Sequence, residues 1–292
     1  MERISPTSDL AFKKALASEG NKDILAGLIK DFYSFEVMEE DLILEHPYSI
    51  DVYREYVEGK EVSVLRHTAK DVAASFDPLK DVLASLKRAD FISEVQVKKT
   101  KYFAERFLYY PFERFCQNYS KAGFIKVGSD GSSRRFSSLR PVYALNILGE
   151  SHFRDDDALR IFEMYDPHRQ KSYPKELIRV GFFELTKLNV ETYNQKHWQD
   201  YFKTGIANPD APCYIKKASE IIDWMNLTQE EREMALALEK AQAIRDEEIF
   251  TALEETREET REEIAKNMLE EGLPPGVVAK CTGLPLDIVK AM

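Results

Sequence analysis

Apolar residues gather in three short runs that are typical of buried strands, at residues 89–97, 142–148 and 178–185. Each run is rich in Val, Ile, Leu or Phe and contains no Pro, and such runs favour β structure. Between the first two runs, residues 100–122 have the spacing of a long aromatic helix, which Pro111 is expected to kink or break. The alternation of strand, helix and strand predicts an α/β core.

Weaker patterns predict further elements around this core. A capped helix is expected to start after residues 5–9 and to continue, with a break near Gly20, as far as Phe32. The other expected elements are short strands at residues 42–44, 71–76 and 159–165, an inserted helix at residues 79–86, and a Gly/Ser/Arg-rich loop at residues 126–139.

The part of the chain beyond Gly205 is expected to contain helices and no strands. Residues 228–271 are almost free of Gly and Pro and rich in Glu, Ala, Arg and Leu, which predicts one long helix. Two short segments then flank residues 282–284 in the manner of a helix-turn-helix. The second segment offers only Lys290 to DNA, which favours a docking or dimerisation module over a reader of base sequence. We therefore expect three parts: a core at residues 1–205, a helical spacer at residues 206–271 and a small helical module at residues 272–292.

The distribution of charge leaves a nucleic-acid partner open. A net charge of −10 argues against one, because DNA binders need basic surface. Residues 87–106 are nevertheless locally basic, whereas acids dominate residues 232–271. A local basic stretch can bind phosphate even when the whole chain is acidic.

Composition also bounds the compartment and the metal chemistry. No run approaches the ~18 consecutive apolar residues of a membrane-spanning helix, and residues 1–9 lack the apolar stretch of a secretory signal. The three cysteines are far apart, which fits reduced thiols, and the five histidines show no ligand spacing, which argues against a zinc site. We therefore expect a cytoplasmic protein that does not span a membrane.

Acidic and amide side chains lie in file on the expected strand at residues 89–97. Because side chains alternate between the two faces of a strand, Glu94, Gln96 and Lys98 point to one side of it. If the preceding strand pairs with this one, Asp71 lies beside Glu94, and two such carboxylates suit a hard cation such as Mg²⁺. Phosphodiester cleavage uses such an ion. With 51 acidic residues in the chain, a solvated strand face explains the same pattern.

The order of several motifs along the chain resembles a known family. That family has an Asp on one strand and Glu-x-Gln on the next, which correspond here to Asp71 and to Ser93-Glu94-Val95-Gln96-Val97. Its other segments correspond to residues 7–14, to residues 102–110 with Gln117, to residues 180–187, and to a tail at residues 264–273 and 282–284. On these segments the chain resembles the Rpn family of recombination-promoting nucleases, a transposase-like branch of the PD-(D/E)XK superfamily.

The resemblance implies both a fold and an activity. The fold would be a PD-(D/E)XK restriction-endonuclease-like core, a mixed sheet flanked by helices, followed by a long helical tail. The activity would be that of a DNA endonuclease of low sequence specificity that needs Mg²⁺ or Mn²⁺ and is associated with recombination or mobile elements. Asp71 and Glu94 would be metal ligands, and Gln96 would complete the catalytic set in the place of the superfamily's lysine. The link from Asp71 to Glu94 is longer than is usual in the family, which leaves three rivals of Asp71: Asp77, Asp81 and Asp90.

Five polar residues are candidate DNA contacts: Lys13, Lys98, Lys99, Arg106 and Gln117. Arg106 and Gln117 belong to one helix stripe with Tyr110 and Glu113, because residues three or four apart share a helix face. Each candidate also has an ordinary alternative. A surface lysine is most often simply solvated, and the stripe can be a half-exposed edge beside the core.

Other functions fit the same sequence. The acidic charge and the missing superfamily lysine also suit a catalytically inactive nuclease fold that binds DNA or regulates another protein. A strand-transferring transposase is a third hypothesis, although such enzymes usually need three acids on a different fold and sizeable end-binding domains. The acidic helix at residues 228–271 either pairs with a copy of itself, as a homo-oligomer, or folds back on the core.

Overall fold

The computed structural model describes residues 3–45, 47–51, 54, 82–85, 89–96, 102–121 and 139–292. These residues form two compact units, Met1–Arg232 and Glu233–Met292. The first unit contains the sheet and the candidate site, and it extends beyond the residue 205 expected for the end of the core.

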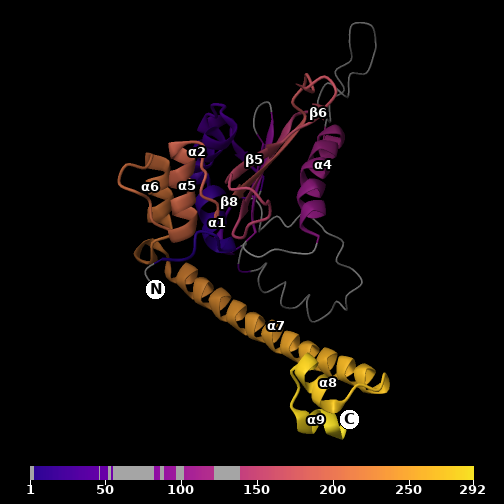
Figure 1. Ribbon diagram of the computed structural model, residues 1–292. Coiled ribbons are helices and arrows are strands. Elements are labelled where there is room, and N and C mark those ends of the chain that lie inside the picture. The colour runs from indigo at the N-terminus through magenta and orange to yellow at the C-terminus, as the bar shows by residue number, and fades with distance from the viewer. Residues whose placement is uncertain are drawn as a thin grey trace. The chain divides into compact units, whose positions relative to one another are not determined.

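A six-stranded mixed sheet forms the centre of the first unit, with the strand order β1-β2-β3-β4-β8-β5 (Figure 1). Its strands are β1 Ile43–Leu44, β2 Val82–Ser85, β3 Asp90–Gln96, β4 Val142–Leu148, β5 Leu159–Phe162 and β8 Ile178–Glu184. The three central strands, β3, β4 and β8, run parallel, and the outer strands pair antiparallel. The expected α/β class and the three strongest expected strands are confirmed, because these runs are buried along almost their whole length.

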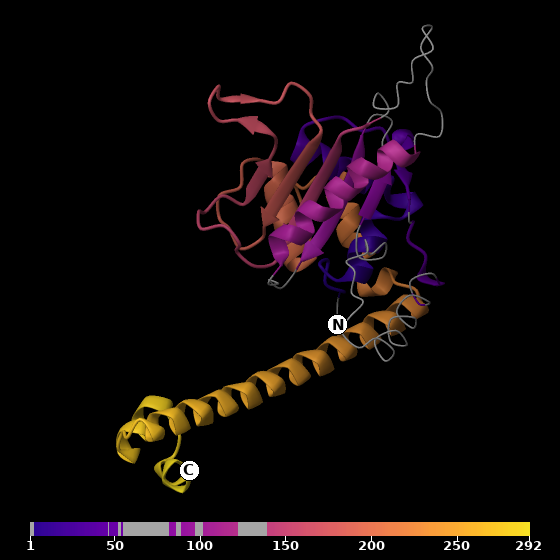
Figure 2. The same cartoon turned by 90° about the vertical axis from the view of Figure 1, so that its right-hand side faces the viewer.

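Helices cover both faces of this sheet (Figures 1 and 2). The α-helices of the first unit are α1 Asp9–Leu16, α2 Lys22–Tyr33, α4 Phe103–Lys121, α5 Tyr193–Thr204 and α6 Cys213–Ile221, and short 3-10 helices lie at Glu19–Asn21, Glu39–Asp41 and Trp224–Asn226. Helices α1, α2, α5 and α6 form the layer on one side, and α4 covers the other side alone among the described helices (Figure 1). The two faces therefore differ in how much of the sheet is covered.

The layer of α2 is tied to the sheet by aromatic side chains. The hydroxyl of Tyr33 donates a hydrogen bond of 2.6 Å to the backbone oxygen of Ala144 in β4. Phe32 packs edge-on against Phe183 of β8 at 4.8 Å between ring centroids. The N-terminal helix begins as expected, because the Ser8 side chain accepts a hydrogen bond from the backbone of the first turn.

The opposite face packs against the aromatic stripe of α4. Phe103 and Phe107 of α4 are buried against Leu148, Val180 and Phe182 of the sheet. Pro111 lies inside the helix, which nevertheless continues to Lys121. The long aromatic helix expected from the sequence is therefore confirmed and runs through the proline.

One expected element is wrong. Residues 79–86 have helical spacing of apolar residues, but residues 82–85 form strand β2 instead. Val82 pairs with Ser93 and Ser85 with Asp90 in an antiparallel ladder. The hydrogen bonds offered by the edge of β3 outweigh the weak local preference of such a short segment. The strand expected at residues 71–76 lies outside the described residues.

A small hairpin extends the fold after β5. The strand expected at residues 159–165 ends at Phe162 and is followed by β6 Tyr165–Asp166 and β7 Lys171–Ser172. These two short strands pair only with each other, outside the main sheet. The hairpin projects from the β5 edge of the sheet (Figure 2).

The expected long helix is confirmed as α7, Gln229–Glu270. Its start is a capping box: the backbone nitrogen of Glu231 donates to the Thr228 hydroxyl, and Glu231 Oε2 accepts from the backbone nitrogen of Thr228. In the second unit, α7 is followed by α8 Pro275–Thr282 and α9 Leu286–Ala291. Ala265, Val278 and Val289 form the small core that holds these three helices together.

Candidate active site

The α4 face of strand β3 carries the acid and the amide singled out by the sequence. Glu94 is 4% exposed and lies level with Asn146 of β4, and Gln96 is half-buried and level with Leu148. Ser93 points the other way and donates to the backbone oxygen of Leu145. The alternation along β3 thus places Glu94 and Gln96 on one face, two residues apart.

Arg106 of α4 joins these two side chains. One guanidinium nitrogen, Nη2, donates to both Glu94 Oε1 and Gln96 Oε1. The Arg106 side chain is 32% exposed, whereas that of Glu94 is 6% exposed. A single cationic group therefore reaches both oxygens from the solvent side. Sequence analysis placed Arg106 with the DNA contacts and did not anticipate this pairing.

Four residues of α4 and two residues of β3 advance by nearly the same distance, and this match aligns the Arg106 contact with a second acid–arginine contact. Four helix residues advance about 6 Å, and two strand residues advance about 6.6 Å. Arg106 meets Glu94, Tyr110 packs on Ile92, and Arg114 meets Asp90, so each helix step of four residues corresponds to a strand step of two. Helix α4 therefore runs antiparallel to β3 with two acid–arginine contacts on one line.

The second contact is a closed ionic cluster around Asp90. Arg114 Nε donates to Asp90 Oδ2 at 3.0 Å, and Arg140 Nη2 lies 2.9 Å from Asp90 Oδ1. Arg114 also donates to both carboxylate oxygens of Glu45. Asp90 is fully buried and the Arg114 side chain is 3% exposed. Both oxygens of this rival carboxylate are held by arginines, so Asp90 has a structural role here.

Burial and nearby charge shift the pKa of Arg114 in opposite directions. Burial alone would lower the pKa of its guanidinium, but the hydrogen bonds and negative charges of Glu45 and Asp90 raise it above the ordinary value. Arg114, Arg140 and Glu45 were missed by the sequence analysis. The available signal was the spacing of Arg106, Tyr110 and Arg114, which places them on one helix face.

At the carboxyl end of β8, Glu184 and Lys187 hold the loop that follows β4. Glu184 Oε1 accepts hydrogen bonds from the backbone nitrogens of His152 and Phe153. The Lys187 ammonium donates to the backbone oxygen of Phe153 at 2.8 Å. Glu184 is the last residue of β8, and its contacts and those of Lys187 tie this loop to the end of the strand.

The other candidate residues are distributed unevenly. Lys13 is 1% exposed in α1, a position that does not support contact with a phosphate. Gln117 is half-buried on α4, about three turns beyond Arg106. Five more candidates lie outside the described residues: Asp71, Asp77, Asp81, Lys98 and Lys99.

The donor atoms that are described fit a hard divalent cation. Glu94 supplies a carboxylate and Gln96 an amide oxygen, the ligand types that Mg²⁺ and Mn²⁺ prefer. Arg106 shows that one positive group can contact both oxygens at once. Within the described ranges no three His, Cys, Asp or Glu side chains gather closely enough to hold a metal. Asp71, Asp77 and Asp81, the acids offered as partners of Glu94 apart from Asp90, lie outside those ranges.

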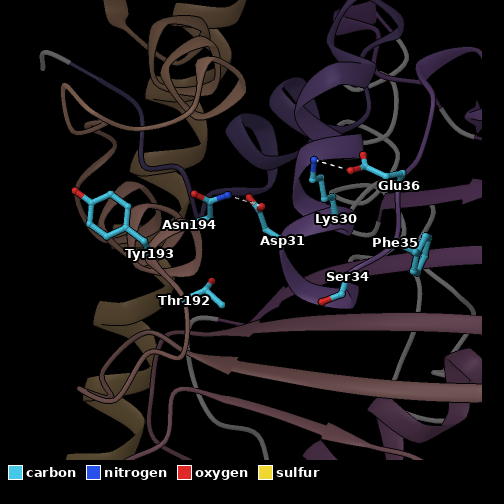
Figure 3. A pocket seen from close by; sticks show the side chains of 8 residues that line it. All are labelled: Lys30, Asp31, Ser34, Phe35, Glu36, Thr192, Tyr193 and Asn194. Atoms are coloured by element: carbon cyan, nitrogen blue, oxygen red, sulfur yellow. Dashed lines mark hydrogen bonds and ion pairs between the residues drawn. The ribbon is translucent and has the colours of Figure 1, made fainter.

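A separate pocket of about 460 Å³ lies on the opposite layer, between the end of α2 and the start of α5 (Figure 3). Its charged groups are already bonded. Asp31 accepts hydrogen bonds from Asn194, Trp198 and Tyr214, and Lys30 pairs with Glu36. This pocket has a structural carboxylate at its wall and lies on the other side of the sheet from Glu94.

A mixed sheet with an antiparallel hairpin leading into parallel strands, and Glu-x-Gln on strand β3, defines the class of PD-(D/E)XK nuclease-like folds. The family model described as "PD-(D/E)XK nuclease family transposase" matches residues 6–256. The chain belongs to this family. The tail segments at residues 264–273 and 282–284 lie beyond the match. Neither a curated protein nor a solved structure matches the chain significantly. Among the described helices, none is long and apolar enough to cross a bilayer.

Proposed function

We propose that this protein is a divalent-metal-dependent DNA endonuclease of low sequence specificity that acts in recombination or on mobile elements. The family supports a nuclease. The observation that carries the proposal is the convergence of the Glu94 carboxylate and the Gln96 amide oxygen on one cationic group, the Arg106 guanidinium. Oxygen atoms that converge on a cation suit a metal bound against a DNA phosphate.

Glu94 and Gln96 would hold the metal from strand β3. A bound Mg²⁺ or Mn²⁺ polarises a phosphoryl oxygen and lowers the pKa of an attacking water. The Glu94 side chain is buried between the sheet and α4, which fixes the carboxylate and limits its access to solvent. Arg106, half exposed beside the same oxygens, would contact the phosphate when the metal is bound.

The first acid of the centre is Asp71 or Asp81. Asp71 is the residue implied by the family resemblance, and ten residues lie between it and Val82. Asp81 is bonded directly to Val82, and consecutive Cα atoms are only ~3.8 Å apart. Val82 pairs with Ser93, the neighbour of Glu94. One further step of the same ladder would set Asp81 opposite Glu94, which makes it the stronger rival.

Plasmid nicking tests the proposal and separates the two acids. Wild-type protein is expected to nick supercoiled DNA with Mg²⁺ or Mn²⁺ and to stop when a chelator is added. Glu94→Gln is expected to abolish nicking. Asp71→Asn and Asp81→Asn are then compared. The metal ligand is the aspartate whose substitution abolishes nicking without changing the melting temperature.

Glu105→Gln is the matched control, because Glu105 is exposed on α4 near the site. Its substitution removes one carboxylate in the same way. It is expected to cut like the wild type. Equal cutting by wild type and Glu94→Gln under all metal conditions would end the nuclease proposal.

An inactive nuclease fold that binds DNA is the second candidate, and the Arg106 contact favours it. A guanidinium already neutralises Glu94, so a bound metal would have to displace it. A binding assay run beside the nicking assay decides between the two: binding of labelled DNA without cutting, under every divalent ion tried, supports the inactive candidate.

A further inference from the structure

The hairpin formed by β6 and β7 is built unlike the rest of this acidic protein. Residues 164–175, the arm, contain Arg169, Lys171 and Lys175 as cations, His168 as a titratable base and Asp166 as the one acid. Every residue of the arm is exposed except the half-buried Asp166. The chain as a whole carries a net charge of −10, so the arm is a local basic projection.

Large apolar side chains on the arm are left without a core. Met164 and Tyr165 are each 54% exposed, and Tyr173 is 52% exposed. The backbone nitrogen of Tyr173 donates to the oxygen of Met164 at 2.9 Å, which places these two residues opposite each other. Met164 and Tyr173 thus form an exposed apolar pair across the two chains of the arm.

The acids at the base and the tip of the arm are already paired. Arg179 contacts Glu163 and Glu176 at 3.1 and 2.8 Å. At the tip, Arg169 Nη1 donates to Asp166 at 2.9 Å. That hydrogen bond, followed by one from the Arg169 backbone, lowers the pKa of Asp166. The arm thus offers cations to a partner and no unpaired carboxylate from these positions.

The arm continues the sheet face that carries the candidate site. Phe162 of β5 packs on Phe182 and Phe153, on the α4 side of the sheet. Because side chains alternate along an extended chain, Met164 follows Phe162 on that side, and Tyr173 lies opposite Met164. One face therefore joins Glu94 to the apolar and basic side of the arm.

We infer that the arm is a β-ribbon that grips duplex DNA on the flank of the cleavage position; this rests on the proposed action on DNA. A two-stranded ribbon fits the major groove, lysine and arginine neutralise phosphates, and apolar side chains in that groove contact thymine methyl groups. Charge complementarity favours DNA phosphates over an arm-to-arm contact between two copies, which would bring the same cations together.

Geometry gives the arm a place on the DNA. Glu94 is level with Arg160 across β4 and β8, and Asp166 lies six residues beyond Arg160. Three strand spacings and six residues of strand rise amount to a diagonal of roughly 24 Å. At ~3.4 Å per base pair, the arm contacts DNA about seven base pairs from the cut phosphate.

The test measures DNA binding without cleavage. Fluorescence anisotropy of the full chain with a labelled duplex, in chelator, compares wild type with Lys171→Gln/Tyr173→Ala. The double variant is expected to bind about fivefold more weakly, because it loses one phosphate contact and one apolar contact in the groove. The slope of log affinity against log salt should fall by about one for the lost phosphate contact. The control, Leu188→Ala/Lys240→Gln, removes an exposed apolar group and an exposed cation elsewhere and should bind like wild type.

Two outcomes would overturn the inference, and a third rejects only the nuclease. Nicking with Mg²⁺, measured on the same proteins, distinguishes between them. Equal binding by the double variant and wild type removes the arm from DNA recognition, whether or not wild type nicks. Wild-type binding that depends on the arm, with no nicking under any metal, keeps the arm and rejects the nuclease. A change of oligomeric state in the double variant, measured by light scattering, would make the arm a contact between copies.

Discussion

Two acid–arginine contacts lie on one face of β3, and they differ in how deeply the arginine from α4 is buried. Asp90 is fully buried, and each of its oxygens is held by a separate arginine, with Glu45 balancing the second positive charge. Glu94 shares one arginine with Gln96, and that arginine is 32% exposed on its side chain. Arg114, the helix arginine that holds Asp90, is 3% exposed, although Arg140 on the other oxygen is 34% exposed. The two contacts therefore differ in the burial of the arginine that α4 supplies.

This difference separates a structural acid from a candidate catalytic one. A buried carboxylate whose oxygens are both taken cannot bind a metal without losing an ion pair that burial makes costly to break. A carboxylate whose partner is half exposed can exchange that partner for a metal ion at lower cost. Local surroundings therefore distinguish Asp90 from Glu94, although the sequence offers them as similar residues of one strand.

The largest expected effect is the loss of activity in Glu94→Gln. The amide keeps the shape of the side chain but removes the charge that holds the metal, so nicking should fall by a factor of about 10³. The midpoint of thermal unfolding should stay close to that of wild type, because Arg106 keeps solvent contact. Initial rates of plasmid nicking and a melting curve on the same sample check both statements.

Asp90→Asn should give the opposite pattern. Removing this charge leaves Arg114 buried with one carboxylate fewer, and the free energy of unfolding should fall by about 3 kcal/mol. Urea denaturation followed by the fluorescence of the buried Trp198 measures this change. A loss of nicking with unchanged unfolding would instead place Asp90 in the active site and reverse the comparison.

Arg106→Met sharpens the comparison from the cation side. Without the competing guanidinium, Mn²⁺ should bind about threefold to tenfold more tightly, because a half-exposed ion pair contributes on the order of 1 kcal/mol. Calorimetric titration of the metal in the absence of DNA tests this, and DNA binding in chelator should weaken in the same variant. Arg114→Met offers the contrast, with no expected gain in metal affinity.

Glu231 provides the smallest effect and a pH dependence. Burial raises the pKa of this carboxyl, but hydrogen bonds from Lys14, the Thr228 backbone and Tyr48 outweigh it, so the pKa of Glu231 in the folded protein lies below its ordinary value of 4.5. The stability it contributes is present above the unfolded pKa and is lost as pH falls from about 4.5 through the folded pKa. The free energy of unfolding of Glu231→Gln should therefore be lower than that of wild type at pH 7. The gap should narrow in acid, and a constant gap would argue against this carboxyl as the cause.

The parts of the fold that could be predicted are those with an uninterrupted local signal. Strands β4 and β8 are buried runs of β-formers, and α7 is a long stretch without Gly or Pro until its end, so their bounds were expected within a residue or two. Strand β2 could not be predicted, because four residues with helical spacing take their structure from pairing with β3.

The candidate site also has a part that the sequence predicts and a part that it does not. The common face of Glu94 and Gln96 follows from alternation alone. The Arg106 contact could not be derived, because it depends on the position and direction of α4 over the strand. The buried Arg114 was missed for a related reason: an arginine within a helix reads as a surface residue until its two acidic partners are known.

The equal steps of α4 and β3 also exclude neighbouring alignments of the two elements. If α4 slid by one turn, Arg106 would face the apolar Ile92 and Tyr110 would cover the Asp90 carboxylate, so both charges would lose their partners together. Inserting one residue between Arg106 and Arg114 would swing the second guanidinium by about 100° around the helix axis. The eight-residue interval between these arginines is therefore a length that the chain cannot change without losing an ion pair.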